Sequence, residues 1–255
     1  MNSENPKGSK AVHTISQIFS LFSIERGEVG IREAGKLLGI LPPTLHRLFS
    51  AMEGVGILSK TSNNRYRLGE RLFELGGLYS LHVPLRKIVR PHAEELAKLF
   101  GMNVHVAIPS QLHPHEVMTI DRIYSIQSPP LVQRVGFRIP MHCSGVGKAI
   151  FAFLEPEIRA RILKEMALVK YTRNTLTDPR RLRAELDQIR KQGFAQDRAE
   201  MYENVHCVAV PVFQNDRVVA SLSMSDSSGR IKNRKKRDRI AGALMDKSTF
   251  ISRQL

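Results

Sequence analysis

The strongest local constraint in the sequence is a pair of adjacent prolines, Pro42 and Pro43. Proline fits the first turn of a helix, because its missing amide hydrogen would have no partner there. The apolar residues that follow recur at helical spacing and predict a buried stripe of Leu45, Leu48, Phe49 and Met52. The opposite side of this helix is polar or small and carries Pro43, Thr44, His46, Arg47, Ser50 and Gly54.

Two shorter segments with helical periodicity precede this helix. The first has a stripe of Val12, Ile15, Ile18, Phe19 and Phe22, and the second has Ile31, Ala34 and Leu38. The second segment ends at Gly39, a residue that suits the left-handed conformation found after many helices. Three short helices, the last two joined by a tight turn, indicate a helix-turn-helix unit.

Two short strands are predicted directly after these helices. The segments "ILSK" and "RYRLG" flank "TSNN", which has the composition of a turn. The unit is therefore winged, and in such units the third helix enters the major groove of DNA. We expect Thr44, His46 and Arg47 to donate hydrogen bonds to bases or phosphates, and Ser50 to permit close approach. Phosphate contacts along the wing are expected from Lys60, Asn63, Asn64, Arg65 and Arg67. The alternatives are a solvated amphipathic helix and a winged unit that binds protein; the basic wing favours DNA.

The stretch "LLGILPPTLHRLFSAMEGVGILSK...RYRLGERLFELG" resembles the N-terminal domain of the IclR family of bacterial transcriptional regulators, and the resemblance continues to about residue 229. It implies a winged helix-turn-helix joined by a linker helix to a ligand-sensing domain. The expected organisation is a flexible N-terminus at 1–10, the DNA-binding domain at 11–70, the linker helix at 71–84 and the effector-binding domain at 85–255.

The second half of the chain has the pattern of an α+β domain, with strands followed by helices and then a hairpin. Strand patterns cover "NVHVAIP", "EVMTIDRI" and "LVQRVGFRIPMH". The helix from Pro179 has the clearest boundaries, with Thr177 or Asp178 as its cap and Gly193 at its end. The segments "HCVAVPVF" and "RVVASLSMS" flank "QNDR" and predict a hairpin. The resemblance implies a GAF-like effector-binding domain here.

The first candidate effector site lies in "MHCSGVGK", with Cys143, Ser144, Gly145 and Gly147. Ser144 can cap the helix that follows, and the two glycines let a backbone approach a ligand closely. Free amide hydrogens at the start of a helix attract anions, so a carboxylate would suit this segment.

The family resemblance adds two further candidate positions for the effector. It marks Asp197 and Cys207 as pocket residues and Glu200 as a further acidic position; Asn204 and Ala199 depart from the family's usual glycine and acidic residue. On the strand at 217–226, Val218, Ala220, Leu222 and Met224 should share one face and three serines the other. In the family the serine face lines the effector cavity, which makes Ser223 and Ser225 candidates.

The charge balance favours an anionic partner. The formal charge is +15, but residues 1–80 hold ten Lys and Arg against seven Asp and Glu, and residues 81–255 hold 29 against 17. Seven of the ten residues from Arg230 to Arg239 are Lys or Arg. This run is expected to be a solvated loop before the last helix, or else an extra contact to phosphate or to an acidic partner.

The two cysteines, Cys143 and Cys207, are too few for a disulfide scaffold and fit a reduced cytoplasm. No signal segment or membrane span is predicted. A cysteine-dependent enzyme using Cys143, His142 and Asp197, or a metal site adding Cys207, is the alternative function. Neighbouring residues on a strand point to opposite faces, so His142 is badly placed to take a proton from Cys143, and no closely spaced ligand pair supports a metal.

We therefore expect a regulator without catalytic residues, metal or cofactor. Its expected partners are a near-palindromic DNA operator, a small organic effector, either a carboxylate or an aromatic compound, and further copies of the chain in a dimer or tetramer.

Overall fold

The computed structural model describes residues 9–127 and 134–255, and the chain divides into two compact units between His82 and Val83. Most of the flexible stretch expected at 1–10 lies outside the described residues, and helix α1 already begins at Lys10. The expected linker corresponds to helix α4, Glu70–Leu81, and the next helix begins at Pro84. Among the described residues, no helix is both long and apolar enough to span a membrane.

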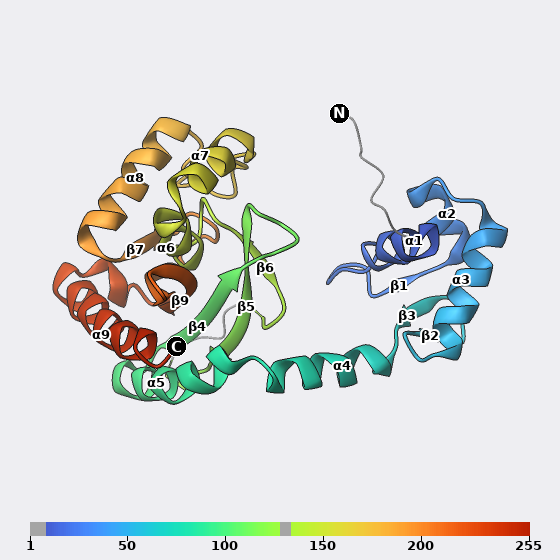
Figure 1. The fold of residues 1–255 in the computed structure, drawn as a ribbon, viewed down its shortest axis with the longest axis horizontal. Helices are drawn as coiled ribbons and strands as arrows, with labels where there is room; N and C mark the ends of the chain where they lie inside the picture. The colour runs from blue at the N-terminus through green and yellow to red at the C-terminus, as the bar shows by residue number, and fades with distance from the viewer. Residues whose placement is uncertain (1–8, 128–133) are drawn as a thin grey trace. The chain divides into compact units, whose positions relative to one another are not determined.

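The first unit contains four helices and a small antiparallel sheet in the described part of the chain (Figure 1). Its elements are α1 Lys10–Phe19, β1 Glu28–Val29, α2 Ile31–Leu38, α3 Pro42–Gly54, β2 Leu58–Lys60, β3 Tyr66–Leu68 and α4. The sheet order is β1-β3-β2. Strand β1 was not expected from sequence, because two residues are too few to give a periodic pattern.

Helix α3 confirms the prediction made from the two prolines. It begins at Pro42, and its buried residues are Leu45, Leu48, Phe49 and Met52. The Phe49 ring meets the Tyr66 ring edge to face, with centroids 4.9 Å apart. This contact fixes α3 against the strands that follow, because offset and edge-on aromatic pairs stabilise beyond the area they bury.

Gly69 joins β3 to α4 at a place where two backbone segments touch. Its amide donates to the carbonyl of Ile57 at 2.8 Å. A Cβ at position 69 would lie 2.1 Å from the carbonyl oxygen of Gly56, a distance that no side chain tolerates. The glycine of "RYRLG" is thus required by close packing within the first unit.

The second unit is built on a six-stranded antiparallel sheet with helices on both faces. The strand order is β6-β5-β4-β9-β8-β7. Helices α5 and α9 cover one face, and α6, α7 and α8 cover the other (Figure 1). The elements are α5 Pro84–Phe100, β4 Asn103–Pro109, β5 Glu116–Ile123, β6 Arg138–Pro140, α6 Gly145–Phe153, α7 Pro156–Glu165, α8 Pro179–Gln192, β7 Ala195–Arg198, β8 His206–Gln214, β9 Arg217–Asp226 and α9 Arg234–Ser252.

Strand β9 separates the two faces of this sheet. Ala220, Leu222 and Met224 pack in the core under α5 and α9, and the alternating serines face α6. The expectation that Val218 shares the face of Ala220 is wrong. The β8–β9 register shifts between Val212 and Phe213, so Val218 packs on the α6 side.

Other elements refine the expectations from sequence. Asp178 caps α8 by accepting a hydrogen bond from the amide of Arg180, which confirms the predicted start of this helix. The turn between β8 and β9 has positive φ at Asn215 and Asp216, as in a tight hairpin, which confirms the hairpin predicted around "QNDR". The strand expected at 131–142 is shorter: residues 131–133 lie outside the described part, and β6 covers only Arg138–Pro140.

The basic run at 230–239 is helical and does not form the expected loop. It spans a 3₁₀ turn at Arg230–Lys232 and the first turns of α9, which Asn233 caps. Arg230 pairs with Asp226 at 2.9 Å and donates to the carbonyl of Gly101 at 3.1 Å. Arg239 lies over the Phe100 ring. Part of the run therefore stabilises the second unit itself.

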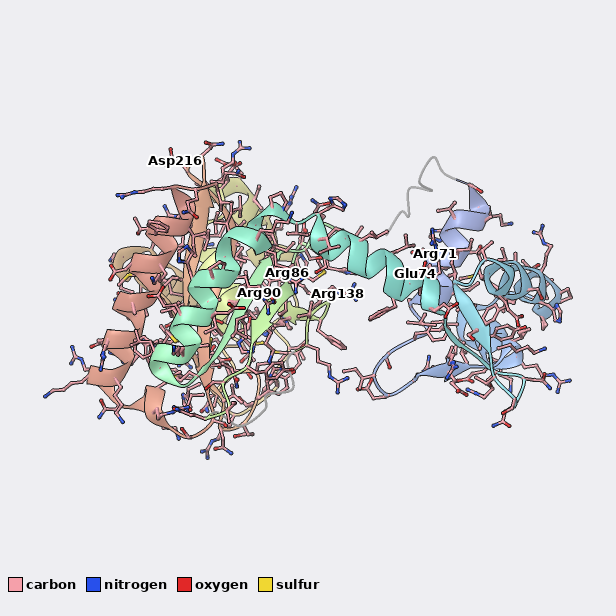
Figure 2. All side chains as sticks on the ribbon, turned by 90° about the horizontal axis from the view of Figure 1, so that it is seen from below. Arg71, Glu74, Arg86, Arg90, Arg138 and Asp216 are labelled. Atoms are coloured by element: carbon pink, nitrogen blue, oxygen red, sulfur yellow. The ribbon has the colours of Figure 1, made fainter. Side chains whose placement is uncertain are left out.

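A buried carboxylate ties α5 to the sheet. The side chain of Asp121 on β5 is 3% exposed and lies 3.1 Å from both Arg86 Nε and Arg90 Nη1. Figure 2 shows both arginines along α5. The same carboxylate accepts from the amide of Arg122 at 2.8 Å. Charge-assisted hydrogen bonds of this kind are stronger than neutral ones, so Asp121 fixes the first two turns of α5.

We predict that Asp121→Ala destabilises the protein by about 2–4 kcal/mol, because it removes the buried carboxylate that Arg86 contacts and leaves Arg90 with Glu94 alone. The measurement is the free energy of unfolding in urea. Asp246→Ala, at an exposed position of α9, is the control and should change it by less than about 0.5 kcal/mol. Equal effects of the two substitutions would contradict the assignment.

Candidate functional site

The polar side of α3 is open to solvent. Pro43, Thr44, His46, Arg47 and Ser50 are all exposed. Within the described ranges, no hydrogen bond or ion pair involves the guanidinium of Arg47. These groups keep their donors available for a partner outside the unit.

The turn between β2 and β3 presents further polar groups. Lys60, Asn63, Asn64 and Arg67 are exposed. Asn64 has φ of 55°, a conformation asparagine tolerates better than most residues, and its amide donates to the carbonyl of Thr61. The turn is therefore closed by its own hydrogen bonds and holds its side chains outward.

Arg65 differs from the free cation expected in the wing. Its Nη2 lies 2.6 Å from Glu33 Oε2 and 3.0 Å from the carbonyl of Glu28. The hydrogen bond with Arg65 holds the pKa of Glu33 below its usual value. The arginine fastens the base of the wing to α2 and β1, so its role in the structure is internal.

On the α6 face of the second unit, three strands bring the predicted effector residues together. The register aligns Asp197 with Cys207 and Cys207 with Ser225 across β7, β8 and β9. One step along, Ala209 aligns with Ser223, and Ser223 with His105 on β4. Residues from four strands, β4, β7, β8 and β9, thus share one polar patch.

The start of α6 packs directly on this patch. A Cβ at Gly145 would lie 2.8 Å from Cys207 Sγ. Glycine at 145 therefore serves close packing, and the same holds at Gly147, where a Cβ would lie 2.5 Å from Met141 Cα. Cys143 and Ser144 are buried beside them.

The expectation of open amide hydrogens at this helix start needs correction. Ser144 caps α6 as predicted, and its Oγ accepts from the amide of Gly147 at 3.1 Å. The same hydroxyl donates to the carbonyl of Pro140 at 2.7 Å. The hydrogen-bonding groups of Ser144 and the amide of Gly147 are thus used within the fold, which weakens the case for an anion bound there.

A buried ion pair that sequence reasoning missed lies next to the patch. Lys148 on α6 is completely buried, and its Nζ donates to both carboxylate oxygens of Glu200, at 2.6 and 2.8 Å. Glu185 on α8 lies 3.5 Å away and also pairs with Arg198. A buried charge requires such partners, because its desolvation would otherwise be very costly.

The backbone around Glu200 is held from several sides. Its amide donates to Asp197 Oδ1 at 2.7 Å, and its carbonyl accepts from Thr175 Oγ1 at 2.6 Å. Thr172 Oγ1 donates to the carbonyl of Ala199 at 2.7 Å. Ala199 itself has φ of 60°, and these bonds keep it in the left-handed conformation.

Burial shifts the pKa values of the titratable groups in this patch toward their neutral forms. It raises the pKa of Asp197 to about 7, and it raises the pKa of both Cys143 and Cys207 to about 12. Burial also lowers the pKa of His105 to about 3. Neutral thiols are poor nucleophiles, so the cysteines do not form an activated pair with a base.

Several buried polar atoms around the patch have no hydrogen-bond partner among the described residues: His105 Nε2, Thr119 Oγ1, His142 Nδ1 and Ser221 Oγ. His142 uses its other nitrogen on the carbonyl of Val169, and His105 uses Nδ1 on Ser225. Residues 9–127 and 134–255 contain no cluster of three or more His, Cys, Asp or Glu that could hold a metal ion. His142, Cys143, Asp197 and Cys207 therefore do not assemble into a metal site there.

We predict that Asp197→Asn changes the pH dependence of stability. Because burial raises the pKa of Asp197 to about 7, the folded state holds a proton that the unfolded state loses from about pH 4 upward, and stability falls as pH rises through this window. Asparagine keeps the acceptor for the Glu200 amide and does not titrate. The stability of the variant relative to the wild type should therefore increase by on the order of 2 kcal/mol between pH 5 and pH 7.5.

Urea unfolding at the two pH values measures this difference. Asp187→Asn, at an exposed position of α8, is the control for loss of a charge. A difference between the Asp197 variant and the wild type that stays constant with pH would show that Asp197 titrates normally.

The sequence and the fold can be compared with known proteins at this point. Residues 78–253 match the family model described as the bacterial transcriptional regulator IclR C-terminal domain. The HTH-type transcriptional regulator XynR of Escherichia coli K12 is 32% identical and the match covers 87% of this chain and 88% of XynR.

Solved structures give the same result. The crystal structure of the Thermotoga maritima IclR is 28% identical, with a TM-score of 0.73 over 96% of this chain and 99% of that chain. An IclR homologue from Microbacterium hydrocarbonoxydans complexed with 4-hydroxybenzoate shares the fold at 24% identity, with a TM-score of 0.80 over 95% and 98% of the two chains.

The named relatives are regulators of transcription and not enzymes, which sets aside the cysteine- or metal-dependent enzyme considered from sequence. The family model covers more than half of the chain, and XynR is similar along most of its length. This chain belongs to the IclR family of bacterial transcriptional regulators.

Proposed function

We propose that the chain is a one-component transcriptional regulator, in which residues 11–70 form a winged helix-turn-helix, residues 71–84 a linker helix and residues 85–255 a GAF-like domain that binds a small organic effector. The observation that carries the DNA-binding part is the exposed polar side of α3. Arg47 lies on this side without a partner among the described residues, and the other side of the helix is buried. A regulator of this kind works in the cytoplasm, where the chromosome lies.

In this proposal α3 enters the major groove and the wing follows the phosphate backbone. Thr44, His46 and Arg47 offer donors to base edges, and Ser50 is small enough for close approach. Lys60, Asn64 and Arg67 contact phosphates, which fixes register without reading sequence. Arg65 positions the wing through Glu33 and is left out of the contacting set.

We predict that Arg47→Ala weakens binding to a duplex selected from a random pool by the wild-type protein, by about 1–3 kcal/mol, with little change in thermal stability. Fluorescence anisotropy at fixed salt measures the affinity. Arg180→Ala, whose side chain is 94% exposed on α8, removes the same charge from the other unit and should leave affinity nearly unchanged. An Arg47 variant that binds like the wild type would exclude the proposed role.

For the effector, the supporting feature is the polar patch on the α6 face. Asp197, Cys207, Ser223 and Ser225 come from three adjacent strands, and the α6 start with Cys143 to Gly147 covers them. With its pKa raised to about 7, Asp197 carries a proton part of the time and can donate it to a ligand oxygen. The effector in this proposal is a small carboxylate or aromatic compound, a class to which 4-hydroxybenzoate, bound by the Microbacterium neighbour, belongs.

We predict reciprocal coupling between the effector and DNA. A compound found by a thermal-shift screen of organic acids should bind with an affinity that changes when the operator is present, and operator affinity must change by the same factor, typically about 5–150-fold. Calorimetry with and without operator measures both. Ser223→Ala with Ser225→Ala should abolish the response and preserve operator binding. Equal effector affinities in the two titrations would contradict a sensor role.

We further propose a homodimer, with a homotetramer as the larger assembly. Helix α4 has no buried residue in its own unit, and its apolar side chains are exposed: Phe73 87%, Leu75 45%, Leu78 53%, Tyr79 58% and Leu81 62%. An exposed apolar surface of this kind usually marks an interface. A second copy covering α4 would place two α3 helices to read a near-palindromic operator.

A further inference from the structure

A cleft in the second unit lies away from the polar patch. It has a volume of about 610 Å³ and lies where the end of α8, the last turns of α9 and the β8–β9 hairpin meet. Figure 2 shows Asp216 at the end of that hairpin. Small-molecule sites in proteins are typically about 300–1,000 Å³, so this cleft has the right size for one.

The floor of the cleft is apolar and includes two aromatic rings. Phe153 and Phe213 meet edge to face with centroids 5.3 Å apart, and Val210, Pro211 and Met245 are the other apolar residues of the lining. Ser252 anchors the hairpin beside them by accepting from the amide of Phe213 at 2.9 Å. A flat apolar group could therefore lie against a surface that is already ordered.

The rim of the cleft is cationic. Arg190, Lys191 and Arg253 line it, against a single carboxylate, Asp216. In the described part of the chain, none of these three cations has a carboxylate within ion-pair distance. Cations near the ends of α8 and α9 also stabilise the helix dipoles, but this does not account for an apolar floor between them.

Arg190 is held in place before any ligand arrives. Its Nη1 donates to the carbonyl of Ala152 at 3.0 Å, and its guanidinium lies 5.6 Å from the Phe153 ring centroid. A planar guanidinium fixed in this way loses little freedom when it binds a carboxylate through its remaining hydrogens. The positive charge of Arg190 therefore lies at the edge of the two aromatic rings.

We propose that this cleft is a second ligand site, distinct from the effector patch, and that it binds a small amphipathic anion with a flat apolar body and one carboxylate. The apolar body lies on Phe153 and Phe213, and the carboxylate meets Arg190 and Arg253. Asp216 disfavours ligands with a second negative charge at the hairpin end.

The test uses the full-length protein and 2-naphthoate as the probe, with 2-naphthamide as its uncharged counterpart. Calorimetry should detect binding of 2-naphthoate. The affinity for 2-naphthamide should be at least about tenfold lower, because the amide lacks the charge-assisted hydrogen bonds. Arg253→Gln should cause a similar loss. Thr249→Trp, at an exposed lining position, should block the cleft outright.

Two controls separate this site from others. Arg180→Gln, exposed at the start of α8 and outside the cleft, should bind 2-naphthoate as the wild type does. The variant with Ser223→Ala and Ser225→Ala should retain the component of 2-naphthoate binding that Thr249→Trp removes, whether or not the effector patch takes up the probe as well. The proposal would be overturned if the serine variant lost the component of binding that Thr249→Trp removes, or if Arg253→Gln and Thr249→Trp both bound 2-naphthoate as the wild type does. A change of molecular mass in Thr249→Trp, measured by analytical ultracentrifugation, would also overturn it, since the cleft would then be an interface between copies.

Discussion

The buried charge of Lys148 is the constraint on which the organisation of the second unit depends. An ammonium group cannot lie inside a protein without partners, so the elements that carry those partners must stay together. Lys148 is on α6, Glu200 follows β7 and Glu185 is on α8. The pair therefore holds two helices and a strand end in one arrangement, with Asp197 attached through the amide of Glu200. Replacing either partner alone would leave a charge in a dry environment.

Much of the architecture could be predicted because local patterns decide it. Two prolines and four apolar residues located α3, Asp178 and Gly193 bounded α8, and "QNDR" located the hairpin. Alternation on β9 separated the serines from the aliphatic side chains, except at Val218, where a bulge that leaves no mark in the sequence reverses the face. The failures concern pairings between distant residues, as with Arg65 and Glu33, whose contact no local pattern reveals.

The candidate sites divide in the same way. Ser223 and Ser225 could be proposed from sequence because a family resemblance and a strand pattern agreed on them. Lys148 was missed, although a signal existed: it is the one charged residue in the apolar segment 145–153, all but the last of whose residues are buried. A lone charge within such a segment indicates a buried partner, but it does not say which carboxylate of the chain that partner is. The basic run at 230–239 shows the converse, because charge density alone predicted a loop where capping by Asn233 starts a helix.

The two thiols have a practical consequence for experiments on this regulator. Cys143 and Cys207 are the chain's only cysteines, both are buried, and burial raises the pKa of each to about 12. Reagents such as maleimides react with exposed thiolates, so the native cysteines should remain unmodified in the folded protein. A cysteine introduced on the exposed side of α3 and another on α8 would then take up spin or fluorescent labels selectively. The separation of the two units could be followed directly in solution, on the native background and with no cysteine removed.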